Sequence, residues 1–318
     1  MAILASAVEA MGGTPLVDLR RLVAGLGLRG RILGKLDYLM PGHSKKDRAA
    51  RAIVGMARAD GSLAPGQPVV ELTSGNMGTG LAIVCACLGH PFIAVMSAGN
   101  SPERARMMRA LGAEVVLVAQ AEGGRPGEVS GADLALVEAA ARRVTDERGA
   151  FRADQFGHPG NPVAHEAGTG PELWDQSGGA ITAFCDFAGS GGTLAGVARF
   201  LTPKGVRCYA VEPEGAEAIG GGDTSRPGHP IQGGGYLMAH LVHLRGVDLA
   251  GTVTVSGGEA RETARALARS EGIFGGFSAG ANVAAAARLL AGPEAGGTVV
   301  AIICDSGLKY LSTDLWEA

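Results

Sequence analysis

Short β-branched runs alternate with longer amphipathic runs from residue 68 onwards. Residues 68–73 (PVVELT) predict a strand and residues 76–89 predict a helix, because the first run is short and β-branched and the second is long enough for several helical turns. The pattern continues as strand, helix and strand over 91–96, 102–112 and 113–119. Such an alternation is typical of βα units built around a parallel sheet.

A second series of the same kind starts near residue 180. Predicted strands and helices follow one another over 180–188, 193–201, 206–213, 252–256, 259–272, 278–292 and 298–305. Each series can form a sheet with helices on both of its faces. We therefore expect an α/β fold with two lobes, each a mostly parallel twisted sheet flanked by helices.

The length and composition of the chain agree with two domains. A chain of 318 residues, 46% of them hydrophobic, can bury two medium-sized cores. Between the two series lie one amphipathic helix (134–144) and the turn-rich segment 156–163, so the boundary is expected near residue 150. We predict an N-terminal domain over 1–150 and a C-terminal domain over 151–318.

Charge and hydropathy argue against several classes of partner. The formal net charge is -3, and the 28 basic and 31 acidic residues are interspersed, which leaves no basic stripe for nucleic acid. No apolar run approaches the ~18 residues of a membrane span, and the first residues lack the segments of a signal peptide. These features predict a cytoplasmic protein that binds neither nucleic acid nor membranes.

The five cysteines predict neither a disulfide framework nor a metal site. Their number is odd, and four of them lie in apolar runs: Cys85, Cys87, Cys185 and Cys304. The close pair Cys85 and Cys87 lacks the two-residue spacing of a metal or redox motif. We expect buried thiols that behave as small hydrophobic groups.

The segment GSGGT (189–193) directly follows a predicted strand and opens a predicted helix. A turn of this kind presents backbone N–H groups and a helix N-terminus to an anion, and glycine allows a close approach. It suggests a phosphate site, although a purely structural left-handed turn would need the same residues. The segment lacks the lysine of a P-loop and the glycine spacing of a dinucleotide fingerprint, which argues against nucleotide and nicotinamide cofactors.

Three further segments carry reactive residue types, and each has a simpler structural interpretation. Lys45 and Lys46 lie at an expected helix start in PGHSKKDR, where a lowered pKa would allow a lysine to form an imine. A basic pair is nevertheless more often part of a solvated face. In TSGN (73–76), and at Ser278 in GGFSAGA, the polar side chains can equally serve as N-caps.

The order and spacing of these four segments resemble the cysteine synthase (O-acetylserine sulfhydrylase) family of fold-type II pyridoxal-phosphate enzymes, which includes the catalytic core of cystathionine β-synthase. The resemblance runs from GGTPLVDL (12–19) to CDSGLKYLST (304–313) and includes IQGGG (231–235). It implies pyridoxal phosphate in a cleft between the two domains, residues 1–35 packed across onto the other domain, and a homodimer.

Carried over position by position, the resemblance assigns a cofactor site. Lys46, which precedes Asp47 and Arg48, would bind the cofactor as a Schiff base. Asn76 would hydrogen-bond the phenolic oxygen, and Ser278 would face the pyridine nitrogen. The phosphate would be held by Gly189, Ser190, Gly191, Gly192 and Thr193.

The substrate site would lie beside the cofactor. The resemblance places the substrate carboxylate against a loop, with one further ligand from another segment. The predicted substrate residues are Thr73, Ser74 and Gly75 of the loop, Gln155 as the further ligand, and Met77, Asn100 and Gly233 around the pocket. No metal ligand is predicted.

The neutral hydroxyl of Ser278 favours one type of reaction. It cannot stabilise a protonated pyridine nitrogen as a carboxylate would, so the ring is a weaker electron sink. Loss of the α-proton is then best coupled to expulsion of a β-leaving group. We expect ping-pong β-substitution on a serine-derived or cysteine-like amino acid through an α-aminoacrylate, with Lys46 as the base.

The sequence departs from the family around the pocket. Met77 stands where cysteine synthases have a threonine, Asn100 where they have a methionine, and His43 where they have a glycine. Small residues of the family are also replaced at Lys45, Asp186 and Phe187. These differences indicate a specialised donor or nucleophile.

An anionic donor such as O-phosphoserine is one such candidate. Arg226 and His229 lie in the long loop 220–235, where they could meet its charge.

Two other functions stay open on the sequence. A β-eliminating lyase of the cysteine desulfhydrase type would use the same residues and would differ only in finishing the cycle with water. A cofactor-free scaffold of the same fold would have no reason to retain Lys46, Asn76, GSGGT and Ser278 together. A nicotinamide dehydrogenase is disfavoured by the glycine spacing already described.

Overall fold

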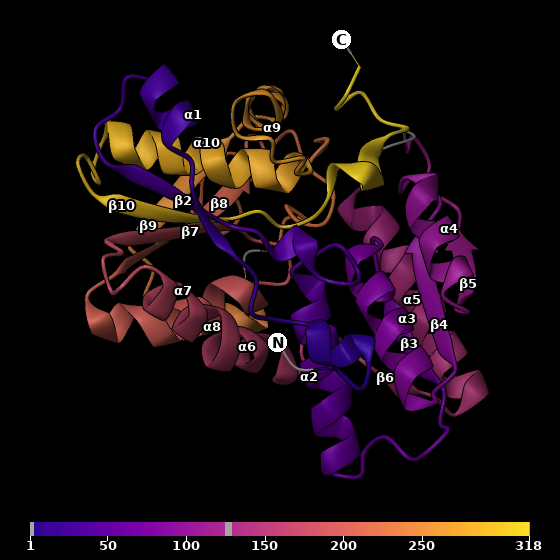
Figure 1. Cartoon of the computed structure of the whole chain (residues 1–318). Coiled ribbons are helices and arrows are strands. Elements are labelled where there is room, and N and C mark those ends of the chain that lie inside the picture. Colours follow the sequence, from indigo (N-terminus) through magenta and orange to yellow (C-terminus); the bar gives the residue numbers. More distant parts are fainter. Residues whose placement is uncertain (1–2, 125–128, 239, 318) are drawn as a thin grey trace.

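The computed structural model describes residues 3–124, 129–238 and 240–317, and parts of the two predicted domains at 1–2, 125–128, 239 and 318 lie outside it. The described residues form two sheets flanked by helices (Figure 1). The larger sheet has the strand order β1-β2-β10-β7-β8-β9 and the smaller one β5-β4-β3-β6. Neighbouring strands are parallel except β1 and β2. The expected α/β class, with two mostly parallel sheets, is confirmed.

The larger sheet combines strands from distant parts of the sequence. Its strands are β1 (Leu16–Asp18), β2 (Arg31–Lys35), β7 (Ala183–Phe187), β8 (Arg207–Pro213), β9 (Gly251–Val255) and β10 (Thr298–Ile302). β2 pairs with β10, so residues 16–35 belong to the same sheet as residues 183–302. β7 and β10 are buried along their whole length, as expected for parallel strands covered on both faces.

The smaller sheet consists of β3 (Val69–Leu72), β4 (Phe92–Ser97), β5 (Glu114–Val118) and β6 (Phe151–Arg152). The first three agree with the predicted strands to within one or two residues. β6 was not predicted, because two residues are too few to produce a periodic pattern. Since β6 pairs with β3, the smaller sheet extends just past residue 150, and the division of the chain at that residue stays a prediction.

Helices flank both sheets. They are α1 (Arg20–Gly25), α2 (Lys46–Ala59), α3 (Asn76–Leu88), α4 (Pro102–Ala110), α5 (Gly131–Arg148), α6 (Gly160–Ala164), α7 (Gly170–Gln176), α8 (Gly192–Leu201), α9 (Gly257–Glu271) and α10 (Phe277–Ala291). α5 begins with a capping box, in which Ser130 and Asp133 each bind the other's backbone N–H, and ends at Gly149 in the left-handed conformation. A π-helical turn (His165–Thr169) joins α6 to α7.

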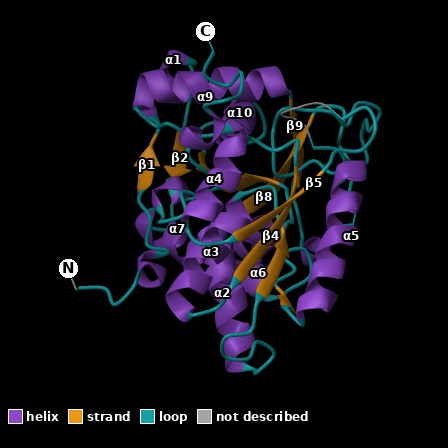
Figure 2. Cartoon of the chain, turned by 90° about the vertical axis from the view of Figure 1, so that its right-hand side faces the viewer, coloured by secondary structure: helices purple, strands orange, loops and turns teal. Residues whose placement is uncertain are grey.

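Apolar cores lie on both faces of each sheet. On the larger sheet, α1, α9 and α10 bury residues such as Leu267 and Leu289 on one face, while α7 and α8 bury Leu173 and Leu194 on the other. On the smaller sheet, α5 covers one face and α3 the other, as Figure 2 shows. In the part of the chain that the structure describes, no helix is long and apolar enough to cross a bilayer.

The cysteines are free thiols in the structure. Cys85, Cys185, Cys208 and Cys304 are buried. Cys87 is exposed, so the prediction of burial was wrong for it. Two residues along a helix from the buried Cys85, its side chain points to another face of α3.

His43, just before α2, has a left-handed backbone with φ +57°. We expect His43→Gly to raise the free energy of unfolding by about 0.5–1 kcal/mol, because glycine removes the Cβ clash of that conformation but adds some freedom to the unfolded chain. Urea unfolding would measure the change. The control is His43→Ala, which loses the imidazole and keeps the Cβ; equal stability of the glycine and alanine variants would contradict the prediction.

Candidate active site

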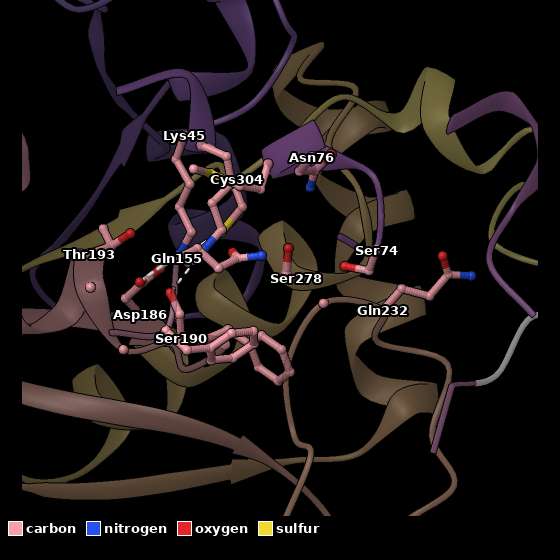
Figure 3. A pocket seen from close by; sticks show the side chains of 18 of the residues that line it. Lys45, Ser74, Asn76, Gln155, Asp186, Ser190, Thr193, Gln232, Ser278 and Cys304 are labelled. Carbon is pink, nitrogen blue, oxygen red and sulfur yellow. Dashed lines mark hydrogen bonds and ion pairs between the residues drawn. The ribbon is translucent and has the colours of Figure 1, made fainter. Parts of the chain in front are cut away.

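A cavity lies between the two sheets, where loops after β3 and β7 meet. This is the edge at which ligands bind in parallel α/β sheets, outside the carboxyl ends of the strands. Figure 3 shows the side chains that line it. They include Lys45, Lys46, Ser74, Asn76, Met77, Gln155, Asp186, Gly189, Ser190, Gly191, Gly192, Thr193, Gly233, Tyr236, Ser278 and Cys304. Most of the predicted site residues are therefore brought together.

Lys46 is the first residue of α2, and its amine points toward the glycine-rich loop. Nζ donates a hydrogen bond to Ser190 Oγ at 3.2 Å. Burial and the neighbouring charge of Lys45 lower the pKa of Lys46 to about 8. A lysine in this setting is neutral in a useful fraction of molecules near neutral pH, which a nucleophilic amine requires.

Lys45 does not lie on a solvated face, so that interpretation of the basic pair was wrong. Its side chain is 10% exposed, and Nζ lies 2.7 and 2.6 Å from the two carboxylate oxygens of Asp186, which is itself buried. The two lysines thus differ sharply. Lys45 is held by a carboxylate, and Lys46 is left as the reactive amine of the pair.

The loop Gly189–Thr193 runs from β7 into α8 and has the shape of an anion cradle. Gly191 has φ +81°, and a Cβ on Gly192 would lie 2.1 Å from Asn161 Oδ1, so neither position accepts a larger residue without change. Ser190 Oγ accepts a hydrogen bond from Asn161 Nδ2 at 2.9 Å. Thr193 Oγ1 lies 3.2 Å from Nε2 of the buried His165. Free amides of the first helical turn and two hydroxyls fit a phosphate group.

The TSGN loop connects β3 to α3. Thr73 Oγ1 accepts hydrogen bonds from the backbone N–H groups of Gly75 and Gly78, each at 2.9 Å, so Thr73 takes the capping role for the start of α3. Arg104, from α4, donates to the carbonyl oxygen of Ser74. Ser74 and Asn76 line the cavity, whereas Thr73 and Gly75 shape the loop behind it.

Asn76 is fixed by two residues near the C-terminal end of the fold. Its Nδ2 donates to Asp305 Oδ2 at 2.7 Å, and its Oδ1 accepts from Lys309 Nζ at 2.8 Å. An amide nitrogen has two hydrogens, so one remains for a ligand oxygen in the cavity. Neither Asp305 nor Lys309 was predicted as a site residue; both lie in the CDSGLKYLST segment, which carried the resemblance without an assigned role.

Ser278 lies in the first turn of α10 and lines the cavity. The N-cap of this helix is Gly276, without a side-chain capping bond, so the N-cap interpretation of Ser278 was wrong. Its hydroxyl instead hydrogen-bonds the Cys304 thiol, whose pKa burial raises to about 12. The group that faces the cavity is therefore a neutral hydroxyl beside a neutral thiol.

Gln155 and Asn100 have different positions relative to the cavity. Gln155 lines it, and its Nε2 donates to the carbonyl of Leu72 at 3.1 Å. Asn100 lies in a separate hollow near α4 and donates to Ser97 O at 3.1 Å. Asn100, which was predicted to contact the substrate, is not among the residues that line the cavity. Tyr236, which was not predicted, does line it and hydrogen-bonds Ser74.

Arg226 and His229 lie outside the cavity lining. Arg226 is exposed and pairs with Glu214 at 3.2 Å and with Asp223 at 3.9 Å. His229 Nε2 lies 3.4 Å from Gly235 O. The suggestion that these two residues meet an anionic donor is therefore not supported by their positions.

The fold and the cavity together define an α/β enzyme that brings a glycine-rich loop and a lysine of lowered pKa to one space at the strand ends. Residues 8–305 match the family described as "Pyridoxal-phosphate dependent enzyme". The chain belongs to this family.

Named relatives refine the comparison. The chain is 37% identical over 314 residues to a cysteine synthase of Staphylococcus aureus, which covers 97% of this chain and 96% of that protein. The solved structure of an O-ureido-L-serine synthase is similar with a TM-score of 0.88 and 36% identity, over 100% of this chain and 96% of that one. An O-acetylserine dependent cystathionine β-synthase from Helicobacter pylori is similar with a TM-score of 0.89 and 30% identity, over 99% and 100%. The expected family, fold type, enzyme class and cofactor are confirmed.

Proposed function

We propose that this chain holds pyridoxal phosphate on Lys46 and uses it to replace the β-substituent of a serine-derived amino acid with another small nucleophile. The observation that carries the proposal is the hydrogen bond from Lys46 Nζ to Ser190 Oγ, at 3.2 Å, inside a cavity that Asn76 and Ser278 also line. A lysine that carries this cofactor must reach both the phosphate loop and the space in which the substrate is held.

The glycine-rich loop fits the cofactor's phosphate. A Cβ on Gly189 would lie 2.3 Å from Gly233 O, and one on Gly192 would lie 2.1 Å from Asn161 Oδ1, so the packing around the loop leaves no room for a side chain at either position. Ser190 and Thr193 would add their hydroxyls to the amides of the first turn of α8. When bound, pyridoxal phosphate supplies the electron withdrawal that acidifies the substrate's α-hydrogen and lets a β-substituent leave.

Lys46 would move the α-proton. Because burial and Lys45 lower its pKa to about 8, Nζ can accept a proton from the substrate's Cα near neutral pH and return it later in the cycle. The attachment of Lys46 to the first turn of α2 keeps the amine beside the reacting carbon throughout.

Ser278 and Asn76 would orient the cofactor ring. A neutral hydroxyl at Ser278 hydrogen-bonds a ring nitrogen without stabilising a positive charge on it, which favours early loss of the β-substituent over transamination or racemisation. The side chain of Asn76 is already clamped between Asp305 and Lys309, so its free N–H has a fixed direction. Ser74, Gln155, Met77 and Gly233 are proposed to surround the substrate.

The names of the relatives support a serine-derived donor. O-ureido-L-serine synthase and O-acetylserine dependent cystathionine β-synthase both carry a serine derivative in their names. Of the described residues, the lysines and arginines that line the cavity are Lys45 and Lys46, and Lys45 is paired with Asp186. We therefore expect a donor with an uncharged leaving group, such as O-acetylserine, to react faster than O-phosphoserine.

A screen of donors and nucleophiles tests the proposal. The protein is incubated with O-acetylserine, O-phosphoserine, serine or cysteine, with and without sulfide or a thiol, and the amino-acid product is detected by mass. Borohydride reduction followed by peptide mass mapping identifies the lysine that carries the cofactor. The expected results are a new β-substituted amino acid only when a nucleophile is present, an adduct on Lys46, and loss of both in Lys46→Ala.

Other outcomes would change the assignment. Release of pyruvate and ammonia as the main products, with or without nucleophile, would make the chain a β-eliminating lyase. A protein that takes up no cofactor would contradict the proposed site. The homodimer and the cytoplasmic location stay predictions; light scattering of the purified protein tests the first and fractionation of cells the second.

A further inference from the structure

Lys45 and Asp186 form a buried ion pair on the wall of the cavity. Lys45 Nζ lies 2.7 Å from Oδ1 and 2.6 Å from Oδ2 of Asp186, and the side chains are 10% and 2% exposed. Figure 3 shows the two side chains converging beside Ser190 and Thr193. The pair joins the residue before α2 to β7, 141 residues further along the chain.

Asp186 is held by a second polar contact from α10. Asn282 Nδ2 donates to Asp186 Oδ1 at 3.0 Å and to the carbonyl of Ile302 at 2.9 Å, while its Oδ1 accepts from Phe187 N at 2.6 Å. On the other side, the backbone N–H of Lys45 donates to Cys304 O at 2.8 Å. Contacts from β7, from α10 and from the segment before α2 therefore hold the two charges in place.

Stability alone does not account for this pair. A buried ion pair costs desolvation energy, and apolar residues of similar volume at the same positions are often as stable or more so. A costly feature on the cavity wall, directly before Lys46, points to a task at Lys46.

We propose that Lys45 and Asp186 are positioning residues that set the charge of Lys46: the pair fixes a buried positive charge on the residue directly before Lys46, on the wall of the same cavity. The inference rests on the proposed function, in which Lys46 carries the cofactor. The neutral amine is the form of Lys46 that can bind the cofactor. Its nitrogen would bond to the cofactor's aldehyde carbon, and the aldehyde oxygen would leave as water with both amine hydrogens.

The other titratable groups around Lys46 contribute little fixed charge at neutral pH. His165 and His243 have pKa values lowered by burial and are neutral, and the Cys304 thiol, with its pKa raised to about 12 by burial, is neutral too. Three groups are exceptions: burial raises the pKa of Glu71, behind the substrate loop, to about 7 and that of Asp47 to about 6, and it lowers the pKa of Lys309 to about 8. Burial is the largest cause that lowers the pKa of Lys46, and Lys45 is the next, while Asp186 acts in the opposite direction.

The test measures the neutral fraction of Lys46 directly. The full chain, stripped of cofactor, is mixed with pyridoxal phosphate, and the rate of uptake is followed by absorbance as a function of pH. Its midpoint reports the protonation of the attacking amine. We expect Lys45→Met to raise the midpoint by about one unit, which slows uptake at pH 7 by about tenfold, and Asp186→Asn to shift it in the opposite direction.

Two further variants keep the test decisive if a single variant folds poorly. Lys45→Arg retains the charge and should keep the original midpoint. Lys45→Met/Asp186→Leu removes both charges and should raise the midpoint above that of the unmodified chain, but by less than Lys45→Met alone, because Lys45 acts on Lys46 more strongly than Asp186 does. Repeating the series in a Glu71→Gln background removes a neighbouring carboxyl whose pKa, about 7, lies in the range of the measurement, and the opposite shifts should persist.

The outcomes separate this inference from the proposed function. Opposite shifts in the two single variants, with the reduced adduct on Lys46, support it. Shifts of the same sign, an unchanged midpoint, or shifts that vanish in the Glu71→Gln background overturn it while leaving Lys46 as the cofactor lysine. An adduct on another residue, or none, overturns the proposed function and this inference with it.

Discussion

Gly192→Ala is expected to weaken the binding of pyridoxal phosphate by about 10- to 100-fold, because a methyl group cannot be added to the wall of the phosphate cradle without moving it. The new Cβ would lie 2.1 Å from Asn161 Oδ1. Asn161 is fully buried and cannot turn away, since its Nδ2 donates to Gln155 O at 2.7 Å and to Ser190 Oγ at 2.9 Å. The displacement would reach the hydroxyl that Lys46 also contacts.

A titration of the stripped protein with pyridoxal phosphate, followed by absorbance, measures the loss. The matched control is Gly55→Ala in α2, where a Cβ meets nothing within 4 Å. This control is expected to bind as tightly as the unmodified chain. If Gly192→Ala also bound the cofactor with unchanged affinity, the loop would not be the phosphate site.

Arg48→Met is expected to lower the free energy of unfolding by about 3–5 kcal/mol, because it leaves the buried carboxylate of Asp37 without its ion-pair partner and leaves Glu172 with Lys35 alone. The guanidinium donates to Asp37 Oδ1 at 3.0 Å, and to Glu172 Oε1 and Oε2 at 2.7 Å each. Asp37 is fully buried. The arginine also donates to Thr14 Oγ1 at 3.1 Å, so one side chain joins the N-terminal segment, α2 and α7.

Urea unfolding at neutral pH measures this effect. Arg51→Met, one turn away on α2, is the matched control: it loses one hydrogen bond to the carbonyl of Met11, at 2.9 Å, and should cost about 1–2 kcal/mol. Equal losses in the two variants would show that the arginine–carboxylate network contributes no more than an ordinary hydrogen bond.

The same cluster gives the Arg48→Met effect a pH dependence. Burial alone would raise the pKa of Glu172, but Arg48 and Lys35 outweigh it and hold the pKa at about 2. A carboxyl whose pKa falls on folding stabilises the fold above its unfolded pKa and loses that contribution as the pH drops toward the folded value. The gap between the unmodified chain and Arg48→Met should therefore narrow between pH 4.5 and about pH 2. A constant gap would contradict the pairing with Glu172.

The periodic parts of the fold could be predicted because their cause is local. A strand such as β3 or β4 is a short apolar run bounded by turn residues. Such a run predicts a strand of a parallel sheet even when its neighbouring strands are not known. The same holds for α3, whose start at Asn76 follows directly from the strand and loop before it. β1 and β2 were not predicted as strands, because β2 pairs with β10, about 270 positions away, and β1 pairs with β2.

The candidate site was predictable to a similar degree. The sequence determined which residue types stand at the starts of four helices: Lys46, the loop from Gly189 to Thr193, Asn76 and Ser278. The structure places all of them around one cavity. It also placed Asn100 in another hollow and Arg226 in surface ion pairs, since the direction of a side chain in a long loop depends on what the loop packs against.

The sequence by itself therefore determined the α/β class through local patterns. It indicated the cofactor family and the candidate lysine through the resemblance of four segments to a known family. Only the tertiary structure decided how the two adjacent lysines differ. Lys45 meets Asp186 because α2 and β7 come together, whereas Lys46 meets Ser190. The pairing of charges from distant parts of a chain depends on their distance in space and on their burial. Neither quantity can be predicted from the spacing of residues along the sequence.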